Sequence, residues 1–502
     1  MHSYKPGCTF STISDIKGKN IVVMGLGLNG GGEACVRFFL KNGANVIATD
    51  MKTEEQLLPT IERLKADKTL DLSKLTYHLG EHRIEDFKNA DCVIKNPGVK
   101  IEGNKYLAEA KNIETDISIF LHFTKAPIIA VTGSKGKSST VSAINYGLNK
   151  AGFTAFLGGN ITVSPLTFLE KTNEKTPVVL ELSSWQLADL RGRGTLKPKI
   201  SIITKIVPDH QNWYHAMEPY VEDKRLIYKN QTSEDYSIFD FEGDEPGTGP
   251  ECGGTWGDLF SRETKGTVLR YAKSKLPEGT FGVYQEEKVG IVEGKVILPG
   301  MKEPETIMKE LCVPGKHMRI NALNASLVLR LMGISSEKCC EIISTWPGID
   351  HRLQFFHEYR GVKFYNDSCA TVPEAAAAAS QSFGKPVYFM TGGTDKGLDL
   401  APLSDTLSGK NNALPLKKLY LLEGSATDKL LPALKENKIN YQGPFKSLSD
   451  MLEALKKDLA ASEHKNDIAV FSPGSTSFGM FTNEFYRGNK YMNAVRDIFS
   501  KD

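Results

Sequence analysis

The sequence has no long apolar run. No stretch approaches the ~18 consecutive apolar residues that indicate a membrane-spanning helix, and the first ten residues, MHSYKPGCTF, contain no apolar segment of signal-peptide type. We therefore expect no membrane span and a cytoplasmic protein.

An excess of charge of either sign is also missing. Lys and Arg number 62 against 60 Asp and Glu, which gives a formal net charge of +2 at pH 7. Proteins that bind nucleic acid or anionic membranes through an overall field carry a clear basic excess. We therefore expect neither partner, and basic residues must act locally.

Paired cysteines are absent as well. The eight cysteines are scattered without a CxxC pair, and Cys339 and Cys340 are neighbours in a helix-like stretch. Such spacing suits neither a disulfide framework nor a zinc site. We expect reduced thiols.

The chain is long enough for several cores. Its 502 residues, 40% hydrophobic and 24% charged, predict a globular protein of about three domains. We place these at residues 1–114, 115–348 and 349–502. Alternating strand-like and helix-like segments predict an α/β fold throughout. The first and third domains are expected to be Rossmann-like, and the second to have a parallel sheet of the P-loop type. Short β-like runs at 279–299 predict a small antiparallel addition.

The stretch IIAVTGSKGKSSTV, residues 128–141, carries the strongest signal. A buried strand, a glycine-containing loop and a helix start are predicted, because an apolar β-branched run is followed by glycines and then by Lys, Ser and Thr. The N–H groups and positive end of such a helix bind anions. Lys137 adds a full charge, and Ser138 offers a hydroxyl ligand to phosphate-bound magnesium. The candidate nucleotide-binding residues are Gly133, Ser134, Lys135, Gly136, Lys137, Ser138 and Ser139.

The spacing of this loop departs from the usual P-loop. Four residues normally separate the two glycines, whereas only Ser134 and Lys135 lie between Gly133 and Gly136. A surface turn is the alternative, but such turns seldom combine a preceding hydrophobic strand with a following GKSS. A shortened phosphate loop is the better interpretation.

A second glycine turn lies in the first domain. Residues 20–50 predict a βαβ unit, with GLGLNGGG as its turn and Asp50 at the end of its second strand. Gly25, Gly27 and Gly30 satisfy GxGxxG, so a dinucleotide is one candidate ligand. No hydride-transfer residues follow, and the same turn can hold any diphosphate, including that of a nucleotide sugar. A further turn, NPG at 96–98, is expected at the same sheet edge.

Polar residues also follow two strands of the second domain. Glu181 ends the strand VVLEL, and Asp209 and His210 follow ISIITKI. Open α/β sheets bind ligands at this carboxyl edge, so Glu181 and His210 are candidate magnesium ligands. Lys224 lies among charges in the helix-like PYVEDKRLIY, and spacing alone predicts a solvated helix lysine.

Together these motifs resemble the Mur ligases of peptidoglycan synthesis, over nearly the whole chain. The resemblance rests on TGSKGKSS, GGNI, LELSSWQL, PDH, KRLIY, PGKH, DHR, YNDS, GGTDKG and SPGSTSF, in family order. It implies a UDP-binding domain, a central ATPase domain and a C-terminal domain that receives an amino acid. The motifs are most similar to those of members that add D-glutamate to UDP-N-acetylmuramoyl-L-alanine through an acyl phosphate, with ATP and two magnesium ions.

The resemblance also implies catalytic roles. Lys137 would hold the β and γ phosphates, Ser138 and Glu181 the first magnesium, and His210 the second. Arg352 would reach the transferring phosphoryl group. Lys224 matches a family lysine that is carbamylated and so becomes an anion beside magnesium, which reverses the expectation from spacing.

The remaining implied contacts are with the substrates. Asn321 and Asp367 resemble the adenine and ribose contacts. The positions that match UDP-sugar contacts are Leu28, Asn29, Asp50, Lys52, Asn96, Gly98 and Asn160, and those that match the glutamate pocket are Thr371, Lys396, Ser477 and Phe478. Three positions depart from the family pattern: Cys369 replaces a lysine, Met318 an asparagine and Gly479 an acid. They bear on glutamate binding more than on ATP chemistry.

Other functions remain open at this point. A related ligase could add L-glutamate, or resemble folylpolyglutamate synthase, although that enzyme lacks the N-terminal UDP-binding unit. An NAD-dependent dehydrogenase would explain residues 25–50 but leave GKSS, Glu181 and Lys224 without a role. A nucleotide-gated regulatory module without catalysis is the fourth alternative. In all cases we expect a monomer.

Overall fold

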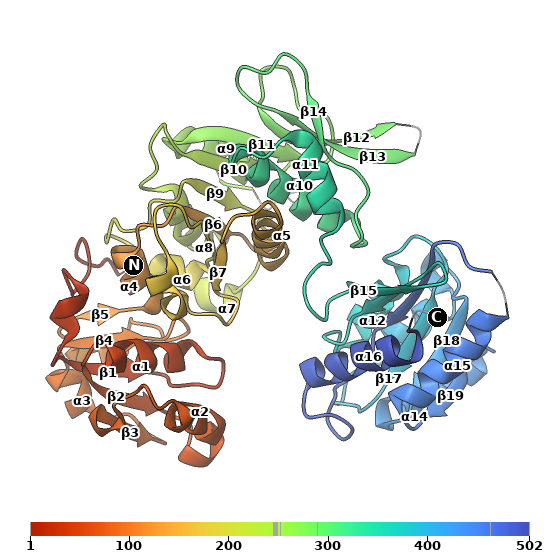
Figure 1. Ribbon diagram of the computed structural model, residues 1–502, viewed down its shortest axis with the longest axis horizontal. Coiled ribbons are helices and arrows are strands. Elements are labelled where there is room, and N and C mark those ends of the chain that lie inside the picture. Colours follow the sequence, from red (N-terminus) through yellow and green to blue (C-terminus); the bar gives the residue numbers. More distant parts are fainter. Residues whose placement is uncertain (1, 244–248, 252, 289, 462, 501–502) are drawn as a thin grey trace. The chain divides into compact units, whose positions relative to one another are not determined.

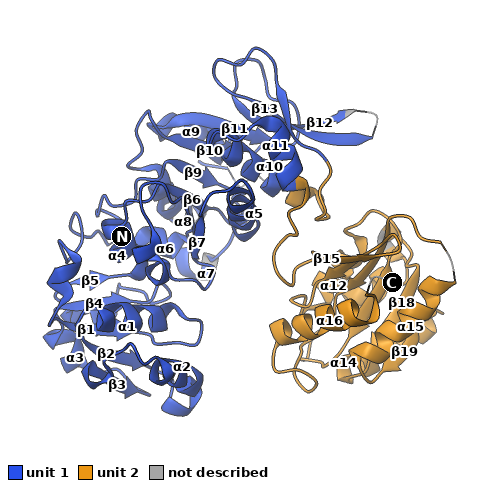
Figure 2. Ribbon diagram, in the orientation of Figure 1, with its two compact units in different colours: residues 1–309, 320–343 blue, residues 310–319, 344–502 orange. Residues whose placement is uncertain are grey.

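The computed structural model describes residues 2–243, 249–251, 253–288, 290–461 and 463–500. The chain forms two compact units, residues 1–309 with 320–343 and residues 310–319 with 344–502 (Figure 2).

The first sheet of the first unit is parallel, with strand order β3-β2-β1-β4-β5 (Figure 1). Its strands are β1 (Asn20–Met24), β2 (Asn45–Asp50), β3 (Leu75–Leu79), β4 (Cys92–Lys95) and β5 (Ile113–Glu114). The helices that alternate with them are α1 (Gly31–Lys41), α2 (Glu54–Ala66) and α3 (Ile84–Asn89). Because β1 pairs with both β2 and β4, the turns that follow these three strands share one sheet edge.

The second sheet has strand order β14-β13-β12-β11-β10-β9-β6-β8-β7. Its strands are β6 (Ile128–Thr132), β7 (Phe156–Gly159), β8 (Val178–Glu181), β9 (Ile200–Ile203), β10 (Tyr236–Asp240), β11 (Thr267–Ala272), β12 (Gly282–Lys288), β13 (Ile291–Ile297) and β14 (Glu305–Met308). The β6 strand is fully buried between β8 and β9. The pair β12–β13 is antiparallel, as predicted for residues 279–299. The pair β13–β14 is also antiparallel, although β14 lies beyond the predicted range, and the rest of the sheet is parallel.

Helices surround this second sheet. They are α4 (Asp116–Phe123), α5 (Lys137–Lys150), α6 (Ser184–Ala188), α7 (Gln211–Tyr214), α8 (Met217–Arg225), α9 (Trp256–Glu263), α10 (Lys316–Leu331) and α11 (Ser336–Ser344). One apolar core runs from the first sheet into the second and includes Ile21, Phe39, Phe120, Ala130 and Leu180. This shared core explains why both sheets belong to one compact unit.

The second unit contains a sheet with strand order β15-β16-β20-β17-β18-β19. Its strands are β15 (Gln354–Tyr359), β16 (Val362–Asn366), β17 (Tyr388–Gly392), β18 (Lys418–Leu422), β19 (Gln442–Phe445) and β20 (Asp467–Phe471). Only β15 runs antiparallel to its neighbour. The helices are α12 (Pro373–Gln381), α13 (Ala401–Leu407), α14 (Ser425–Glu436), α15 (Leu448–Ala460) and α16 (Glu484–Ile498).

The predicted α/β class with three sheets is confirmed. The sheets span residues 20–114, 128–308 and 354–471, inside the three expected domains. The domain boundaries themselves stay a prediction. In the part of the chain that the structure describes, no helix is both long and apolar enough to cross a membrane.

Candidate active site

The phosphate loop lies between β6 and α5, so the predicted strand, loop and helix start are confirmed. Gly133 and Gly136 have φ of 139° and 93°, a backbone region that strains any other residue. A Cβ at Gly133 would lie 2.0 Å from Thr204 Oγ1, and one at Gly136 would lie 2.6 Å from Asn321 Oδ1. The loop thus needs both glycines, and Asn321, the predicted adenine contact, lies directly against it.

Two lysines meet at one carbonyl of this loop. Lys137 Nζ donates to Gly133 O (2.9 Å) and Ser134 O (3.0 Å), and Lys224 Nζ donates to Gly133 O (2.8 Å). Lys224 also lies 4.5 Å from the ring centroid of Tyr220. Burial, and then the charge of Lys137, hold the pKa of Lys224 well below its usual value. Burial also lowers the pKa of Lys137.

The burial of Lys224 overturns one expectation. Spacing predicted a solvated helix lysine, but Lys224 is only 1% exposed. The reason is that α8 packs its Tyr220 side against the phosphate loop, where the Tyr220 hydroxyl donates to Ser134 Oγ (3.0 Å). The role that the family resemblance implied, a carbamylated lysine beside magnesium, stays a prediction.

Glu181 places a carboxylate beside the loop, at the end of β8. Its Oε1 accepts from Asn160 Nδ2 (2.9 Å), whereas the buried Oε2 has no hydrogen-bond partner among the described residues. An unpaired buried oxygen is costly, and carboxylate and hydroxyl oxygens are ligands that magnesium prefers. Glu181 therefore fits a magnesium ion together with Ser138, which stands exposed in the first turn of α5. Among the described residues, no cluster of three or more His, Cys, Asp or Glu could hold a metal.

His210 follows β9, the other neighbour of β6. It is exposed, has a φ of 52°, and its ring centroid lies 4.7 Å from that of Trp185. Its backbone N–H donates to Asp209 Oδ1 (3.0 Å). Asp209 and Glu181 both act on the pKa of Lys224 and Lys137, so the structure brings these charged groups together. The second magnesium at His210 stays a prediction.

Ser134 is engaged by the protein itself. Its hydroxyl donates to Val207 O (2.9 Å) and accepts from Val207 N (3.0 Å) as well as from Tyr220. Its backbone N–H, like that of Lys135, donates to Lys205 O. These bonds tie the loop to the segment after β9. The N–H groups of Lys137, Ser138 and Ser139 open α5, where helix geometry provides no internal partner.

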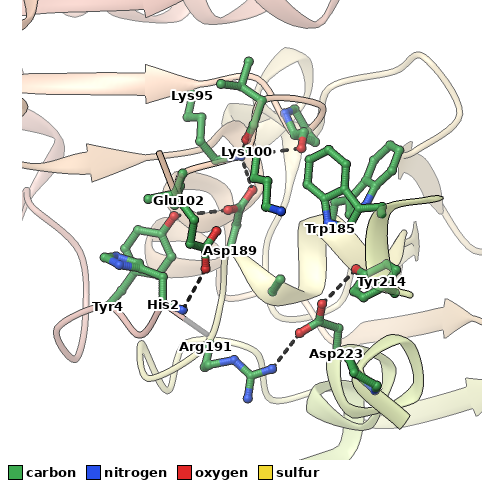
Figure 3. A pocket seen from close by; sticks show the side chains of 16 residues that line it. His2, Tyr4, Lys95, Lys100, Glu102, Trp185, Asp189, Arg191, Tyr214 and Asp223 are labelled. Atoms are coloured by element: carbon green, nitrogen blue, oxygen red, sulfur yellow. Dashed lines mark hydrogen bonds and ion pairs between the residues drawn. The ribbon is translucent and has the colours of Figure 1, made fainter. Parts of the chain in front are cut away.

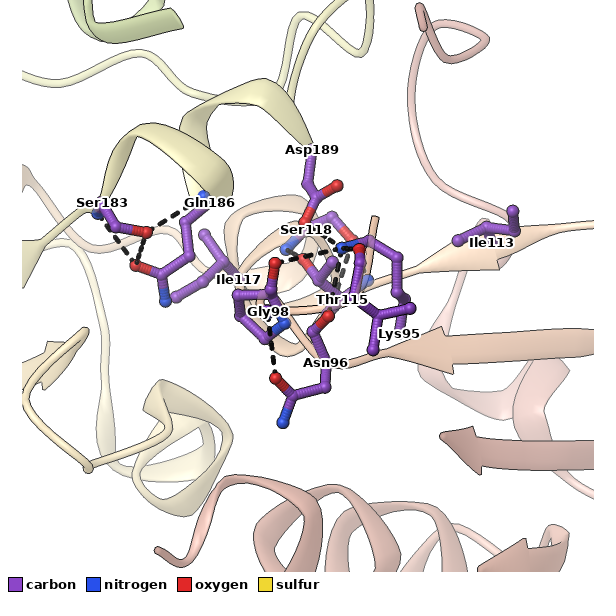
Figure 4. Close-up of polar contacts among 12 residues, drawn as sticks. Lys95, Asn96, Gly98, Ile113, Thr115, Ile117, Ser118, Ser183, Gln186 and Asp189 are labelled. Atoms are coloured by element: carbon purple, nitrogen blue, oxygen red, sulfur yellow. Dashed lines mark hydrogen bonds and ion pairs between the residues drawn. The ribbon is translucent and has the colours of Figure 1, made fainter. Parts of the chain in front are cut away.

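The predicted UDP-sugar residues other than Asn160 lie at the carboxyl edge of the first sheet. Asp50 accepts from Gly27 N (2.9 Å) and Lys52 N (2.9 Å), so its carboxylate holds the glycine turn. Asn96 Oδ1 accepts from Gly98 N (3.0 Å) in the next turn (Figure 4). The predicted contacts that are exposed at this edge are Leu28, Asn29, Lys52, Asn96 and Gly98.

Asn160 connects this edge with the phosphate loop. It follows β7 and bonds Glu181, as described above. Two residues later, Thr162 O lies 3.6 Å from where a Cβ at Gly30 would be. The turn at 160–162 thus lies between Gly30, in the glycine turn of the first sheet, and the carboxylate of Glu181.

In the second unit, Asp367 and Arg352 lie at the carboxyl end of β16. Asp367 accepts from Leu353 N (3.0 Å) and Ser472 Oγ (2.6 Å). Burial raises its pKa to about 6, and the charge of Arg352 acts in the opposite direction. Arg352 itself is exposed.

The predicted glutamate residues also gather in this unit. Lys396 Nζ donates to Thr371 Oγ1 (3.4 Å). The neighbouring Thr394 donates its hydroxyl to Phe478 O and pairs with Thr476, which brings Ser477 and Phe478 to the same loops. Ser477 is buried, and Phe478 is 65% exposed.

The three departures have distinct structural settings. Gly479 has a φ of 100°, and a Cβ there would lie 3.2 Å from Thr394 Oγ1, so this backbone favours glycine over an acid. Burial raises the pKa of Cys369 to about 11, which keeps its thiol uncharged. Met318 is buried.

One residue of this region was missed in the sequence. Arg487 in α16 is buried and donates to Ser368 Oγ and O, Ser475 O and Thr476 O. It therefore ties the turn after β16 to the loop after β20. No sequence signal marks it, because its partners lie up to 119 residues away.

Comparison with known proteins identifies the family. Residues 19–118 match the model of the Mur ligase MurD-like N-terminal domain, and residues 131–249 match that of the Mur ligase middle domain. A UDP-N-acetylmuramoylalanine–D-glutamate ligase of Treponema pallidum is 38% identical, with 96% of this chain and 98% of that protein covered. The enzyme of that name from Borreliella burgdorferi is 37% identical over 97% of this chain and 99% of its own length.

Solved structures agree on the fold. The MurF ligase of Thermotoga maritima, in complex with ADP, superimposes with a TM-score of 0.50 at 17% identity and covers 98% of this chain and 97% of that one. At this identity the likeness bears on the fold alone. With full-length relatives above 30% identity and two family models in sequence order, the chain belongs to the Mur ligase family and is of the MurD-like type.

Proposed function

We propose that the chain is an ATP-dependent ligase that joins D-glutamate to UDP-N-acetylmuramoyl-L-alanine in peptidoglycan precursor synthesis. The observation that carries the proposal is the phosphate loop, where Lys137, Lys224 and an unpaired Glu181 oxygen surround one helix start. Relatives that cover 96% and 97% of the chain and bear the name of this activity support the choice of substrates.

The reaction has two steps. The γ-phosphoryl group of ATP passes to the substrate carboxylate, which gives an acyl phosphate and ADP. The glutamate amine then attacks the acyl carbon, a C–N bond forms, phosphate leaves with the C–O bond electrons, and the amine loses a proton. Negative charge is redistributed in both steps, so preorganised cations and N–H donors lower the barrier.

The residues of this chain divide the work. Lys137, now bonded to loop carbonyls, would turn to the β and γ phosphates, which the N–H groups at the start of α5 also bind. Ser138 and Glu181 would hold magnesium, with His210 at a second ion; the metal supplies charge neutralisation on the phosphates. Arg352 would stabilise the transferring group. Asn321 would contact adenine, and Asp367 would accept from ribose hydroxyls.

Lys224 is proposed to be carbamylated. The modification needs a neutral amine, which adds carbon dioxide and releases a proton to become an anion. The lowered pKa of this buried amine favours the neutral form. A carbamate would also relieve the repulsion between two ammonium groups that share Gly133 O.

The substrates would bind at the two remaining clusters. The UDP-sugar would lie along the exposed turns of the first sheet, with Asn160 leading toward Glu181. The glutamate carboxylates would pair with Lys396 and the Thr371 hydroxyl, with Ser477 and Phe478 beside them. A monomeric, cytoplasmic enzyme stays part of this proposal.

A phosphate-release assay with ATP and UDP-N-acetylmuramoyl-L-alanine tests the proposal. D-Glutamate should support release, and L-glutamate should not. Activity with L-glutamate alone would favour the related ligase, and activity with a folate substrate the folylpolyglutamate synthase-like alternative. Absence of any ligase activity, with reduction of NAD by an added alcohol or hydroxy acid, would favour the dehydrogenase.

A further inference from the structure

A buried lysine holds the turn that follows β4. Lys95 ends that strand, and its Nζ donates to the carbonyls of Val99 (2.9 Å), Asn96 (3.1 Å) and Pro97 (3.5 Å). The same ammonium pairs with Asp189 Oδ2 at 2.9 Å (Figure 4). The ammonium therefore gathers the carbonyls of the turn whose Asn96 and Gly98 are proposed UDP-sugar contacts, while those two residues stay exposed.

Asp189, the partner of this lysine, lies in the segment that follows β8 of the second sheet. Asp189 directly follows α6, and Tyr4 donates its hydroxyl to Asp189 Oδ1 (3.1 Å). The helix begins just after Glu181, with Ser183 and Gln186 bonding each other's backbone N–H groups at its start (Figure 4). One ion pair thus connects the turn at the sugar-binding edge with the helix that follows the proposed magnesium ligand.

A cavity borders the Lys95–Asp189 ion pair. Lys95 and Asp189 line a cavity of about 280 Å³ together with Trp185, Tyr214 and Asp223 (Figure 3). The side chains of Lys95 and Asp189 are only 2% and 6% exposed. A buried pair of this kind is weak evidence for stability, and its best-attested use is to fix register between elements.

A second buried pair offers a comparison within the same unit. Arg193 pairs with Glu114 at 2.8 Å, with exposures of 3% and 1%, and also joins the first sheet to the segment after α6. Arg193 donates to Ile113 O and Asp189 O, and in the described part of the chain it makes no hydrogen bond to the turn at 96–99. Both ion pairs are buried and both join the first sheet to the segment at or after α6. Of the two, the Lys95–Asp189 pair is the one that bonds to the sugar-binding turn.

From this difference we infer that Lys95 and Asp189 are positioning residues for the UDP-sugar substrate. The ammonium fixes the shape of the turn at 96–99, and Asp189 sets its place relative to α6 and Glu181. In the proposed reaction the substrate extends from the turn at 96–99 to the region of Glu181. The ion pair therefore determines how tightly the UDP-sugar end is bound when the substrate carboxylate is in position to react. This inference rests on the proposed function.

The test is steady-state kinetics of Lys95→Met in the full chain. We expect KM for UDP-N-acetylmuramoyl-L-alanine to rise about 10- to 100-fold, the scale of hydrogen bonds to a charged group. The KM for ATP and kcat should each change by less than about threefold. Lys95→Arg should recover part of the loss, and Asp189→Asn should raise the same KM.

The matched control is Glu114→Gln, which breaks the ion pair with Arg193 but leaves Arg193 bonded to the Asp189 carbonyl. It removes a buried pair from the same region, so it should lower the melting temperature without a selective rise in the KM for the UDP substrate. The double variant Lys95→Met/Asp189→Asn should be no worse in KM than Lys95→Met alone, because both changes break the same ion pair and the asparagine oxygen can still accept from the Tyr4 hydroxyl.

The outcomes are separable. An unchanged KM for the UDP substrate in folded Lys95→Met, or an equal loss with ATP, would overturn the inference and leave the proposed function intact. If Lys95→Met does not fold, Lys95→Arg is measured instead, and an unchanged KM for the UDP substrate in that variant would overturn the inference. A wild-type protein that does not act on UDP-N-acetylmuramoyl-L-alanine would overturn both proposals.

Discussion

The phosphate loop of the first unit and the amino-acid loops of the second present their cations in opposite ways. Lys137 and Lys224 are bonded to loop carbonyls, and Lys224 is buried. Arg352 and Lys396 are exposed, and the hydrogen bond from Lys396 to Thr371 is long, at 3.4 Å. The charges of the first unit are held by the chain, whereas those of the second are open to a ligand.

This difference indicates different effects on the reaction. In the proposed function the charges at the phosphate loop lie where the phosphoryl group reacts, so they act mainly on the barrier. An exposed cation contributes when a ligand carboxylate or phosphate pairs with it. We therefore expect changes near the phosphate loop to lower kcat, and changes in the amino-acid loops to raise KM.

The largest effect is expected for Lys224→Ala. Turnover should fall about a thousandfold, because the anion beside magnesium would be lost. Acetate or formate should restore part of it by occupying the vacated space. Lys224→Arg should not be rescued, since the guanidinium keeps the wrong charge there. Phosphate release measures each variant.

A nearby lysine provides the control for Lys224. Lys229 lies five residues further along the chain and is exposed, so Lys229→Ala should keep near-normal turnover. Wild-type protein incubated with isotope-labelled bicarbonate should show a carbamate signal by NMR that Lys224→Ala lacks. Full activity of Lys224→Ala without an added anion would refute its role.

Lys137→Ala should come next, with turnover reduced by roughly two to three orders of magnitude, the scale of losing one preorganised donor. The same phosphate-release assay applies. Lys150, exposed at the other end of α5, provides the control, and Lys150→Ala should leave turnover unchanged. Near-normal turnover in Lys137→Ala would count against the phosphate-loop assignment.

The two lysines of the phosphate loop also show how far the sequence alone could reach. Residues 128–141 predict their own structure, because strand, glycines and helix start are all local signals. The burial of Lys224 depends on Tyr220 packing against Ser134, 86 residues away, and no local pattern reports such a contact. The family resemblance alone pointed to a functional role for that lysine, and that role stays a prediction.

The second unit shows the same limit. The strands and the exposed loop residues follow from periodicity and motifs. Arg487 and the pair of Lys95 with Asp189 in the first unit were invisible, because each joins segments about a hundred residues apart and lies outside every motif. Gly479 is intermediate: its motif suggested an acid, and the positive φ explains the glycine.

Lys396→Ala should raise KM for D-glutamate about 10- to 100-fold and change kcat little. A charge-assisted hydrogen bond contributes about 1.5–3 kcal/mol, and an exposed side chain adds mainly to binding. The control is Lys435→Ala, at an exposed position of α14 in the same unit. A loss confined to kcat would contradict the contrast between the two units.

A several-fold effect is expected from pH at Asp367. Burial raises its pKa to about 6, so the carboxylate that would accept from ribose hydroxyls is protonated below that pH. Nucleotide affinity, measured by calorimetry, should fall about three- to tenfold on acidification through pH 6. Asp367→Asn should show weak nucleotide binding that does not depend on pH in this range.

The raised pKa of Asp367 also affects folding stability. Because the folded-state pKa lies above the ordinary 3.8, this group favours folding at low pH, and that contribution is lost as pH rises toward 6.

The smallest effect is expected at Cys369, which stands where the family has a lysine. Burial raises the pKa of its thiol to about 11, so at neutral pH the side chain is an uncharged, weakly reactive group. Cys369→Ser should therefore change kcat and KM for D-glutamate by less than about threefold, and alkylation by iodoacetamide at neutral pH should be slow compared with a free thiol.

Cys369→Lys restores the family cation beside Arg352, whose charge already acts on this thiol. If the amino-acid loops depend on ligand pairing rather than on built-in charge, this variant should lower KM for D-glutamate modestly and leave kcat unchanged. A large gain in kcat would show that a fixed cation at this position contributes to the chemistry, and that the second unit is organised like the phosphate loop after all.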